Sequence, residues 1–292
     1  FSFMDFYGRR IRRIFPALIL VLTFCFALGW FVLLPDEYKQ LGKHMAGGAG
    51  FVQNFVLWNE ADYFDNIAET KPLLHLWSLG VEEQFYIVWP ILLWLAYRLR
   101  ANLLLLTLVI GLISFGLNIY GVKDNGTGTF YSPQTRFWEL LIGATLAYLT
   151  LHPPILASIR TKLKLHSQIS SSSWANMRSL LGAALFIAGL VLINKKSLFP
   201  GWWALLPTLG SVLILSAGTQ AFLNRTILSN KILTWFGLIS YPLYLWHWVL
   251  LSFARIMDGQ TPDPWIRAAL VLLSIALSAI TYYFIEKPIR FG

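Results

Sequence analysis

Ionisable side chains interrupt long apolar stretches of this sequence, and the richest cluster reads HLWSLGVEEQFY over residues 75–86. Glu82 and Tyr86 are four positions apart and share one face of a helix, whereas adjacent positions diverge by about 100°. We therefore expect Glu82, Tyr86 and His75 to carry catalysis, and Glu83 to decorate a helix N-terminus, where negative charge is favoured. That structural reading stays open for Glu82 as well.

Three further clusters combine charge with apolar surroundings. Arg136 and Glu139 are three positions apart, which fits a structural ion pair or a pair that binds substrate. Tyr244 and His247 lie in an apolar run, where the histidine either carries a proton or bonds to a neighbour. The arginines of residues 9–13 either set membrane topology or clamp a phosphate, which guanidinium groups bind through two parallel hydrogen bonds.

The composition indicates the class of protein that must position these clusters. Of 292 residues, 57% are hydrophobic and 13% are charged, whereas soluble domains have about 45–50% and about 25%. The chain is therefore predicted to be a polytopic membrane protein in contact with lipid. Its single cysteine excludes a disulfide scaffold and a cysteine-based metal site, and we expect no metal. The net charge of +9 fits loop lysines and arginines better than nucleic-acid binding.

A membrane-spanning helix needs about 20 apolar residues, and the sequence offers about eight such segments. They are residues 14–34, 79–97, 103–120, 137–151, 179–193, 201–217, 233–254 and 266–285. A shorter, glycine-rich stretch at 46–58 is predicted to be re-entrant or interfacial. With that choice and both ends cytoplasmic, most lysines and arginines fall in inside loops, as the positive-inside rule requires. The predicted fold class is all-α.

The clusters occur in the order typical of acyltransferase family 3, and the chain resembles those bacterial membrane proteins over nearly its whole length. The motifs that carry the resemblance are FYGRRIRRIFPAL (6–18), LLHLWSLGVEEQFYIVWP (73–90), SPQTRFWELLIGA (132–144), ISYPLYLWHW (239–248) and YYFIEKPIR (282–290). The resemblance implies transfer of an acyl group from cytoplasmic acyl-CoA to a hydroxyl of an extracytoplasmic glycan. It also implies a multi-pass protein of the bacterial cytoplasmic (inner) membrane.

The family motifs map onto single residues of this chain. The Arg-x-x-Arg motif, on the acyl-CoA side, matches Arg10 and Arg13, and the WSLxVE glutamate matches Glu82. The substrate-side residues implied or inferred here are Arg136, Glu139, Tyr244 and His247. The family's key histidine lies in a preceding helix, so residues 1–292 are expected to be the acyltransferase membrane domain without its first two helices. The ending resembles members that continue into an SGNH-type domain, which is not present here.

The predicted reaction uses acetyl-CoA as donor and a cell-surface glycan or lipid-linked saccharide as acceptor, such as lipopolysaccharide O-antigen or peptidoglycan. Arg10 and Arg13 are expected on the cytoplasmic side, about 30 Å of membrane away from an outer cluster of His75, Glu82 and Tyr86. Glu82 would orient or charge the histidine of the preceding helix. The alternative is a non-enzymatic transporter or flippase of a lipid-linked glycan, although the sequence shows no internal repeat.

Overall fold

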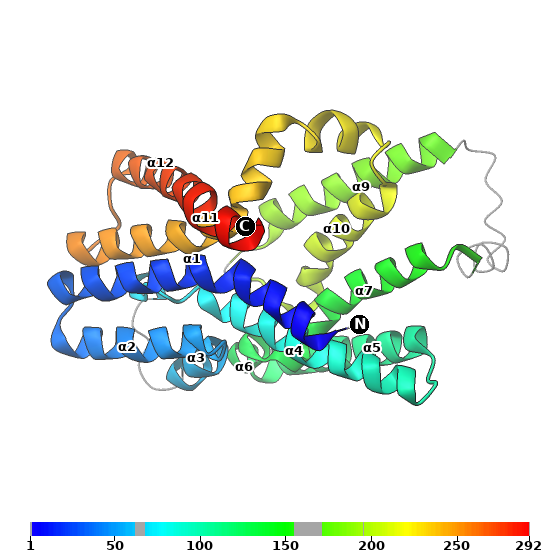
Figure 1. Ribbon diagram of the computed structural model, residues 1–292, viewed down its shortest axis with the longest axis horizontal. Coiled ribbons are helices and arrows are strands. Elements are labelled where there is room, and N and C mark those ends of the chain that lie inside the picture. Colours follow the sequence, from blue (N-terminus) through cyan, green and yellow to red (C-terminus); the bar gives the residue numbers. More distant parts are fainter. Residues whose placement is uncertain (1, 62–67, 155–170, 195, 292) are drawn as a thin grey trace. The chain divides into compact units, whose positions relative to one another are not determined.

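The computed structural model describes residues 2–61, 68–154, 171–194 and 196–291, and every regular element among them is helical (Figure 1). Six helical segments in these ranges are long and apolar enough to span a membrane, and two apolar segments are shorter. The long ones are α1 (Phe3–Val32), α4 (Leu76–Arg98), α5 (Leu103–Asp124), α9 (Ser171–Leu192), α11 (Lys231–Asp258) and α12 (Pro264–Thr281), the last continued by η5 (Tyr282–Glu286) and α13 (Lys287–Phe291).

The shorter apolar segments are α7 (Phe137–Leu151) and the pair η3 (Gly201–Ala204) and α10 (Leu205–Ala217). The predicted all-helical, membrane-spanning class is therefore confirmed. The predicted number of about eight spans is not, because these two segments fall short of the length that a bilayer crossing requires.

The chain divides into two compact units. The terminal unit comprises Phe1–Glu83 and Thr234–Gly292, and the central unit comprises Gln84–Leu233. Helix α4 begins in the terminal unit and continues into the central one. Each unit is described by itself below.

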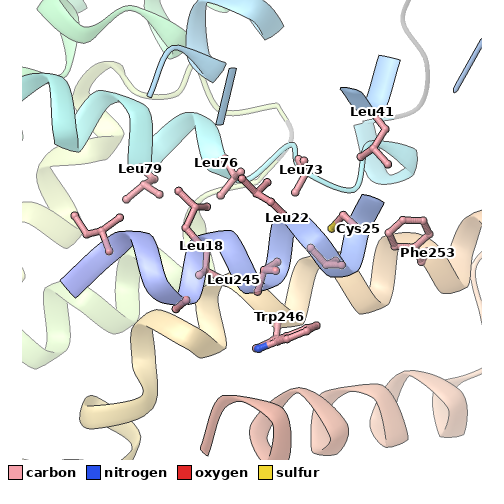
Figure 2. Packing of buried hydrophobic residues seen from close by; sticks show 14 residues of the cluster. Leu18, Leu22, Cys25, Leu41, Leu73, Leu76, Leu79, Leu245, Trp246 and Phe253 are labelled. Carbon is pink, nitrogen blue, oxygen red and sulfur yellow. The ribbon is translucent and has the colours of Figure 1, made fainter. Parts of the chain in front are cut away.

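The terminal unit is held together by leucine-rich faces of α1, α4 and α11. Leu18 and Leu22 of α1 belong to one buried cluster with Leu76 of α4 and with Leu245 and Phe253 of α11. Figure 2 shows that residue numbers rise in opposite directions along α1 and the start of α4, and in the same direction along α1 and α11. The antiparallel pairing brings the N-terminal part of α1 to the second turn of α4.

The stretch 46–58 forms the end of α2 (Pro35–Ala49), a turn, and the start of α3 (Gln53–Ala61). It is not among the candidate spans of the described residues, as predicted. Its polar residues Gln53 and Asn54 are fully buried. Gly80 of α4 allows this packing, because a Cβ there would lie 3.1 Å from the Phe51 carbonyl oxygen.

The central unit contains α5, α6 (Gly126–Tyr131), η2 (Pro133–Thr135), α7, α9, η3, α10 and the π-helical turn η4 (Asn224–Leu228). Helices α9 and α10 approach so closely that a Cβ on Gly182 would lie 2.7 Å from the Gly210 carbonyl oxygen. Asn118 of α5 exchanges two hydrogen bonds with the backbone of Gly201, of 3.2 and 3.0 Å.

Candidate functional site

Arg10 of α1 and Glu83 of α4 form a buried ion pair in the terminal unit. Arg10 Nε donates to Glu83 Oε2 at 3.1 Å, and Nη2 donates to Oε1. The Glu83 side chain is 7% exposed and that of Arg10 is 17% exposed. Fork-like pairs of this kind are among the stronger hydrogen-bonded interactions. The expectation that Glu83 only decorates a helix N-terminus is therefore wrong.

Glu82 lines a cavity of about 330 Å³ together with both members of this pair, and we call it the first cavity. Its side chain is 48% exposed, and its Oε1 lies 4.0 Å from Arg10 Nη2. The residues that line the cavity are Arg10, Arg13, Ile14, Ser78, Leu79, Glu82, Glu83, Ser240, Tyr241 and Tyr244.

The structure corrects the expectation that the arginines and Glu82 lie about 30 Å apart. Arg10, Arg13 and Glu82 line one cavity, because α1 and the start of α4 run antiparallel. An arginine next to apolar residues is costly unless it is paired, and the glutamates of α4 supply the partner.

His75 does not line the first cavity but lies beside Tyr244, which does, in a cluster with His247 and Trp248. Its ring centroid is 4.9 Å from that of Tyr244, 6.0 Å from that of His247 and 6.3 Å from that of Trp248. Its carbonyl oxygen accepts hydrogen bonds from the hydroxyls of Tyr244 and Ser78. Three of the residues singled out in the sequence, His75, Tyr244 and His247, are thus brought together.

The His75 imidazole is buried. Burial lowers its pKa to about 3, and the nearby charge of His247 adds to the effect. Protonation would place an uncompensated charge in a low-dielectric environment. We therefore expect the ring to be uncharged near pH 7.

Tyr86, Arg136 and Glu139 belong to the central unit. Tyr86 packs on a buried cluster of Phe85, Trp89 and Leu141. The Arg136 and Glu139 side chains form an ion pair of 3.1 Å, and the guanidinium also lies over the rings of Phe130 and Phe199. The structural pairing anticipated from the spacing is present, and these cation–π contacts add to it.

Glu60 is a polar hub that sequence reasoning missed. Its carboxylate accepts hydrogen bonds from Gln40 at 3.4 Å, Lys43 at 3.0 Å and Lys71 at 3.3 Å, and it lies 2.8 Å from His44 Nε2. The hub borders a second cavity of about 200 Å³, lined in part by His44 and Lys71. No local pattern indicates it, because its members come from separate segments.

Glu60 is expected to make stability depend on acid. Burial raises its pKa, but the His44 and Lys43 hydrogen bonds and the charges of His44 and Lys71 outweigh this and lower it to about 2. The unfolded chain binds the proton first, so the stabilisation is present above about pH 4.5 and is lost as the pH falls toward 2. Thermal unfolding in detergent, measured at pH 6 and pH 3, checks this.

The Glu60→Gln variant should have a lower melting temperature than the natural protein at pH 6. Its melting temperature should also fall less between pH 6 and pH 3. Asp36→Asn is the matched control, because Asp36 is an exposed acid of the same unit. If the melting temperature falls equally between pH 6 and pH 3 in the natural protein and in Glu60→Gln, Glu60 is not the source of the acid sensitivity.

The described residues form a helical protein with six helices long enough to span a membrane and an arginine-lined cavity. Comparison with known proteins shows which family it belongs to. Residues 1–283 match the family described as acyltransferase domain, acyltransferase family 3, and the chain belongs to this family. No solved structure matches the chain.

Particular relatives can also be named. The chain is 29% identical to YrhL of Bacillus subtilis (strain 168), provisionally named a peptidoglycan O-acetyltransferase, over 99% of this chain and 46% of that protein. It is 28% identical to O-acetyltransferase OatA of Staphylococcus aureus (strain NCTC 8325 / PS 47), over 98% and 47%. The same identity relates it to peptidoglycan O-acetyltransferase OatA of Listeria monocytogenes, over 98% and 46%. The chain spans about half the length of these relatives.

Proposed function

We propose that the chain transfers an acetyl group from acetyl-CoA, bound on the cytoplasmic side, to a hydroxyl of an extracytoplasmic glycan. The protein would lie in the bacterial cytoplasmic membrane with both ends of this chain inside. The names of the relatives favour peptidoglycan over O-antigen as acceptor. The observation that carries the proposal is the first cavity, which joins Arg10, Arg13 and Glu82 and extends to Tyr244 beside His75.

Arg10 and Arg13 would have different roles in binding acetyl-CoA. Arg10 is held by Glu83, so it contributes a fixed, largely compensated charge. Arg13 is exposed and lines the same cavity, so its guanidinium is available to a phosphate of CoA. The sequence-based proposal of two equivalent phosphate ligands thus becomes one main ligand, Arg13, beside one anchored partner.

The acyl end of the donor would extend toward His75. The helical rise of about 1.5 Å per residue puts about 12 Å between Glu83 and His75, a distance that suits an extended pantetheine arm. Ser78 and Tyr244 both line the cavity, and their hydroxyls lie 3.0 Å apart. A thioester placed there is next to the buried imidazole.

Acyl transfer then needs one proton acceptor. As the glycan oxygen attacks the thioester carbonyl, His75 takes the hydroxyl proton; the carbon–sulfur bond breaks, and the proton passes to the leaving thiolate. Glu82 has one carboxylate oxygen 4.0 Å from Arg10 Nη2, and its negative charge would help to orient the reacting groups. The roles predicted for His247 in the terminal unit, and for Tyr86, Arg136 and Glu139 in the central unit, stay predictions.

The test uses inverted membrane vesicles that contain the full-length natural protein, supplied with acetyl-labelled acetyl-CoA. Label should appear in glycan recovered from the vesicles. If acetyl-CoA is not consumed while the folded protein moves a lipid-linked glycan across the membrane, the protein is a transporter and the proposal is wrong.

Arg13→Gln is expected to raise KM for acetyl-CoA by about 10-fold to 100-fold with little change in kcat. A hydrogen bond to a charged group contributes about 1.5–3 kcal/mol, and about 1.4 kcal/mol is tenfold in affinity. Arg9→Gln is the matched control, because Arg9 is exposed in the same helix but does not line the cavity. An unchanged KM in Arg13→Gln, or equal changes in both variants, would remove Arg13 from the donor site.

A further inference from the structure

We propose that Glu286 is a positioning residue of the donor site, which holds the Arg13 guanidinium in place for a phosphate of CoA. This inference rests on the proposed acyl transfer, because it explains how Arg13 is set for its ligand. Glu286 belongs to the motif YYFIEKPIR (282–290), from which no residue takes part in the proposed reaction. It ends the π-helical turn η5 of the terminal unit, and its side chain is 3% exposed.

The π-helical turn directs Glu286 toward the interior of the unit. The buried face of α12 comprises Ser274, Ser278 and Thr281. Thr281 accepts a hydrogen bond from Trp246 Nε1 at 3.0 Å, which fixes this face against α11. An α-helix rotates by about 100° per residue, so five regular steps would put Glu286 about 140° away from Thr281. A π-helical turn needs more residues for each rotation, and it therefore returns Glu286 toward the buried face.

The Glu286 carboxylate is only partly compensated. Its Oε1 accepts a hydrogen bond at 3.3 Å from Nη1 of Arg290, whose side chain is 36% exposed. Its Oε2 is buried and has no hydrogen-bond partner among the residues that the structure describes. A buried carboxylate oxygen without a partner costs free energy, because it has lost water without gaining another donor. Glu286 thus offers an acceptor to a second cation.

Arg13 is the cation that suits this acceptor. Helix α1, which carries Arg13, contacts both η5 and α13 at the C-terminal end of the chain (Figure 1). Arg13 is exposed and forms no ion pair in the described part of the chain, although its charge acts on the Glu286 carboxylate. The Glu286 charge also acts on Tyr241, which lines the first cavity with Arg13. Glu286 therefore lies near the first cavity without lining it.

Arg13 can bind Glu286 and a phosphate at the same time, because a guanidinium has five N–H donors in a planar fork. With one edge on Glu286 Oε2, it presents another to a phosphate oxygen of CoA. Arg10 already has a buried acid of this kind, which is Glu83 of α4. Each of the two arginines thus has its own buried acid, Arg10 in the empty protein and Arg13 when the donor binds.

The experiment measures binding of CoA to the purified full-length protein in detergent by calorimetric titration. Glu286→Gln removes the charge and keeps the size of the side chain, and it should raise the Kd for CoA about 10-fold. Glu286→Asp keeps the charge but withdraws it by one methylene group, so its Kd should lie between those of Glu286→Gln and the natural protein. Asp263→Asn is the matched control and should change nothing, because Asp263 is an exposed acid at the start of α12.

A double-mutant cycle separates positioning of Arg13 from a general effect on the fold. If Glu286 acts through Arg13, Glu286→Gln should not weaken CoA further in a protein that already carries Arg13→Gln. In labelled acetyl transfer, Glu286→Gln should raise KM for acetyl-CoA and leave kcat near that of the natural protein. Equal losses of affinity in both backgrounds, or an unchanged Kd in Glu286→Gln, would overturn the proposal. If Glu286→Gln does not fold, an unchanged Kd in Glu286→Asp overturns it in the same way.

CoA binding is measured without acyl transfer, so the role of Glu286 and the proposed function fail in different ways. A protein that shows the expected Kd values but transfers no acetyl group contradicts the proposed reaction and supports the role of Glu286. A protein that transfers acetyl groups and binds CoA equally well with Glu286 or glutamine contradicts the role of Glu286 alone. A natural protein that binds no CoA overturns both.

Discussion

Replacing Glu83 by glutamine is expected to destabilise the terminal unit by about 3 kcal/mol, while the same change at Glu82 leaves its stability nearly unaltered. Breaking a buried ion pair costs about 3–5 kcal/mol, because the remaining charge is left uncompensated. The lower value applies here because the Arg10 side chain keeps 17% of its exposure. The Glu82 side chain is 48% exposed and 4.0 Å from Arg10, so its contribution to folding is small.

For enzymatic activity we expect the direct effect from Glu82→Gln, not from Glu83→Gln. Glu82→Gln should lower kcat about 100-fold or more, as expected for a group that assists proton transfer, in a protein that melts normally. Glu83→Gln should lower the melting temperature and the amount of protein that accumulates in membranes. Thermal unfolding in detergent and labelled acetyl transfer, measured on both variants, check the pair. Full acetyl transfer by Glu82→Gln would exclude Glu82 from the reaction.

The fold class could be predicted because the apolar runs are long. The segment 14–34 lies almost wholly in α1, and 233–254 lies in α11. The segment at 201–217 was harder, because its first turn is the separate helix η3 and only α10 continues. Hydropathy averages over such breaks, so it overestimates the length of a continuous helix. Hydropathy therefore predicts the class of this protein but not the number of its spans.

The composition of the site was predictable, but its geometry was not. The helical period predicts that Glu82 and Glu83 face different directions, but both line the first cavity and both lie within 4.0 Å of Arg10 Nη2. The period also does not say which of the two is buried, since α4 is apolar on most of its surface. That choice depends on Arg10, which is 73 positions away. The contact between His75 and Tyr244, 169 positions apart, likewise exists only in the folded unit. Glu60 was missed for the same reason.

His75→Gln is the variant with the largest expected loss of activity. Removing a general base costs about 100-fold to 10,000-fold in rate, and the loss should fall on kcat, because His75 does not line the arginine-bearing cavity. The KM for acetyl-CoA should stay near that of the natural protein. His152→Gln is the control: His152 is exposed, stacks on Tyr148 in the central unit and should be silent.

The pH profile separates a chemical role of His75 from a structural one. A base acts in its neutral form, and with a pKa lowered to about 3 the imidazole stays neutral from pH 5 to pH 8. The natural protein should therefore show no loss of kcat from this group as the pH falls through 6.5, where an ordinary histidine titrates. A limb near pH 6.5 that disappears in His75→Gln would contradict the buried neutral state. Full activity of His75→Gln with both substrates saturating would remove His75 from the mechanism altogether.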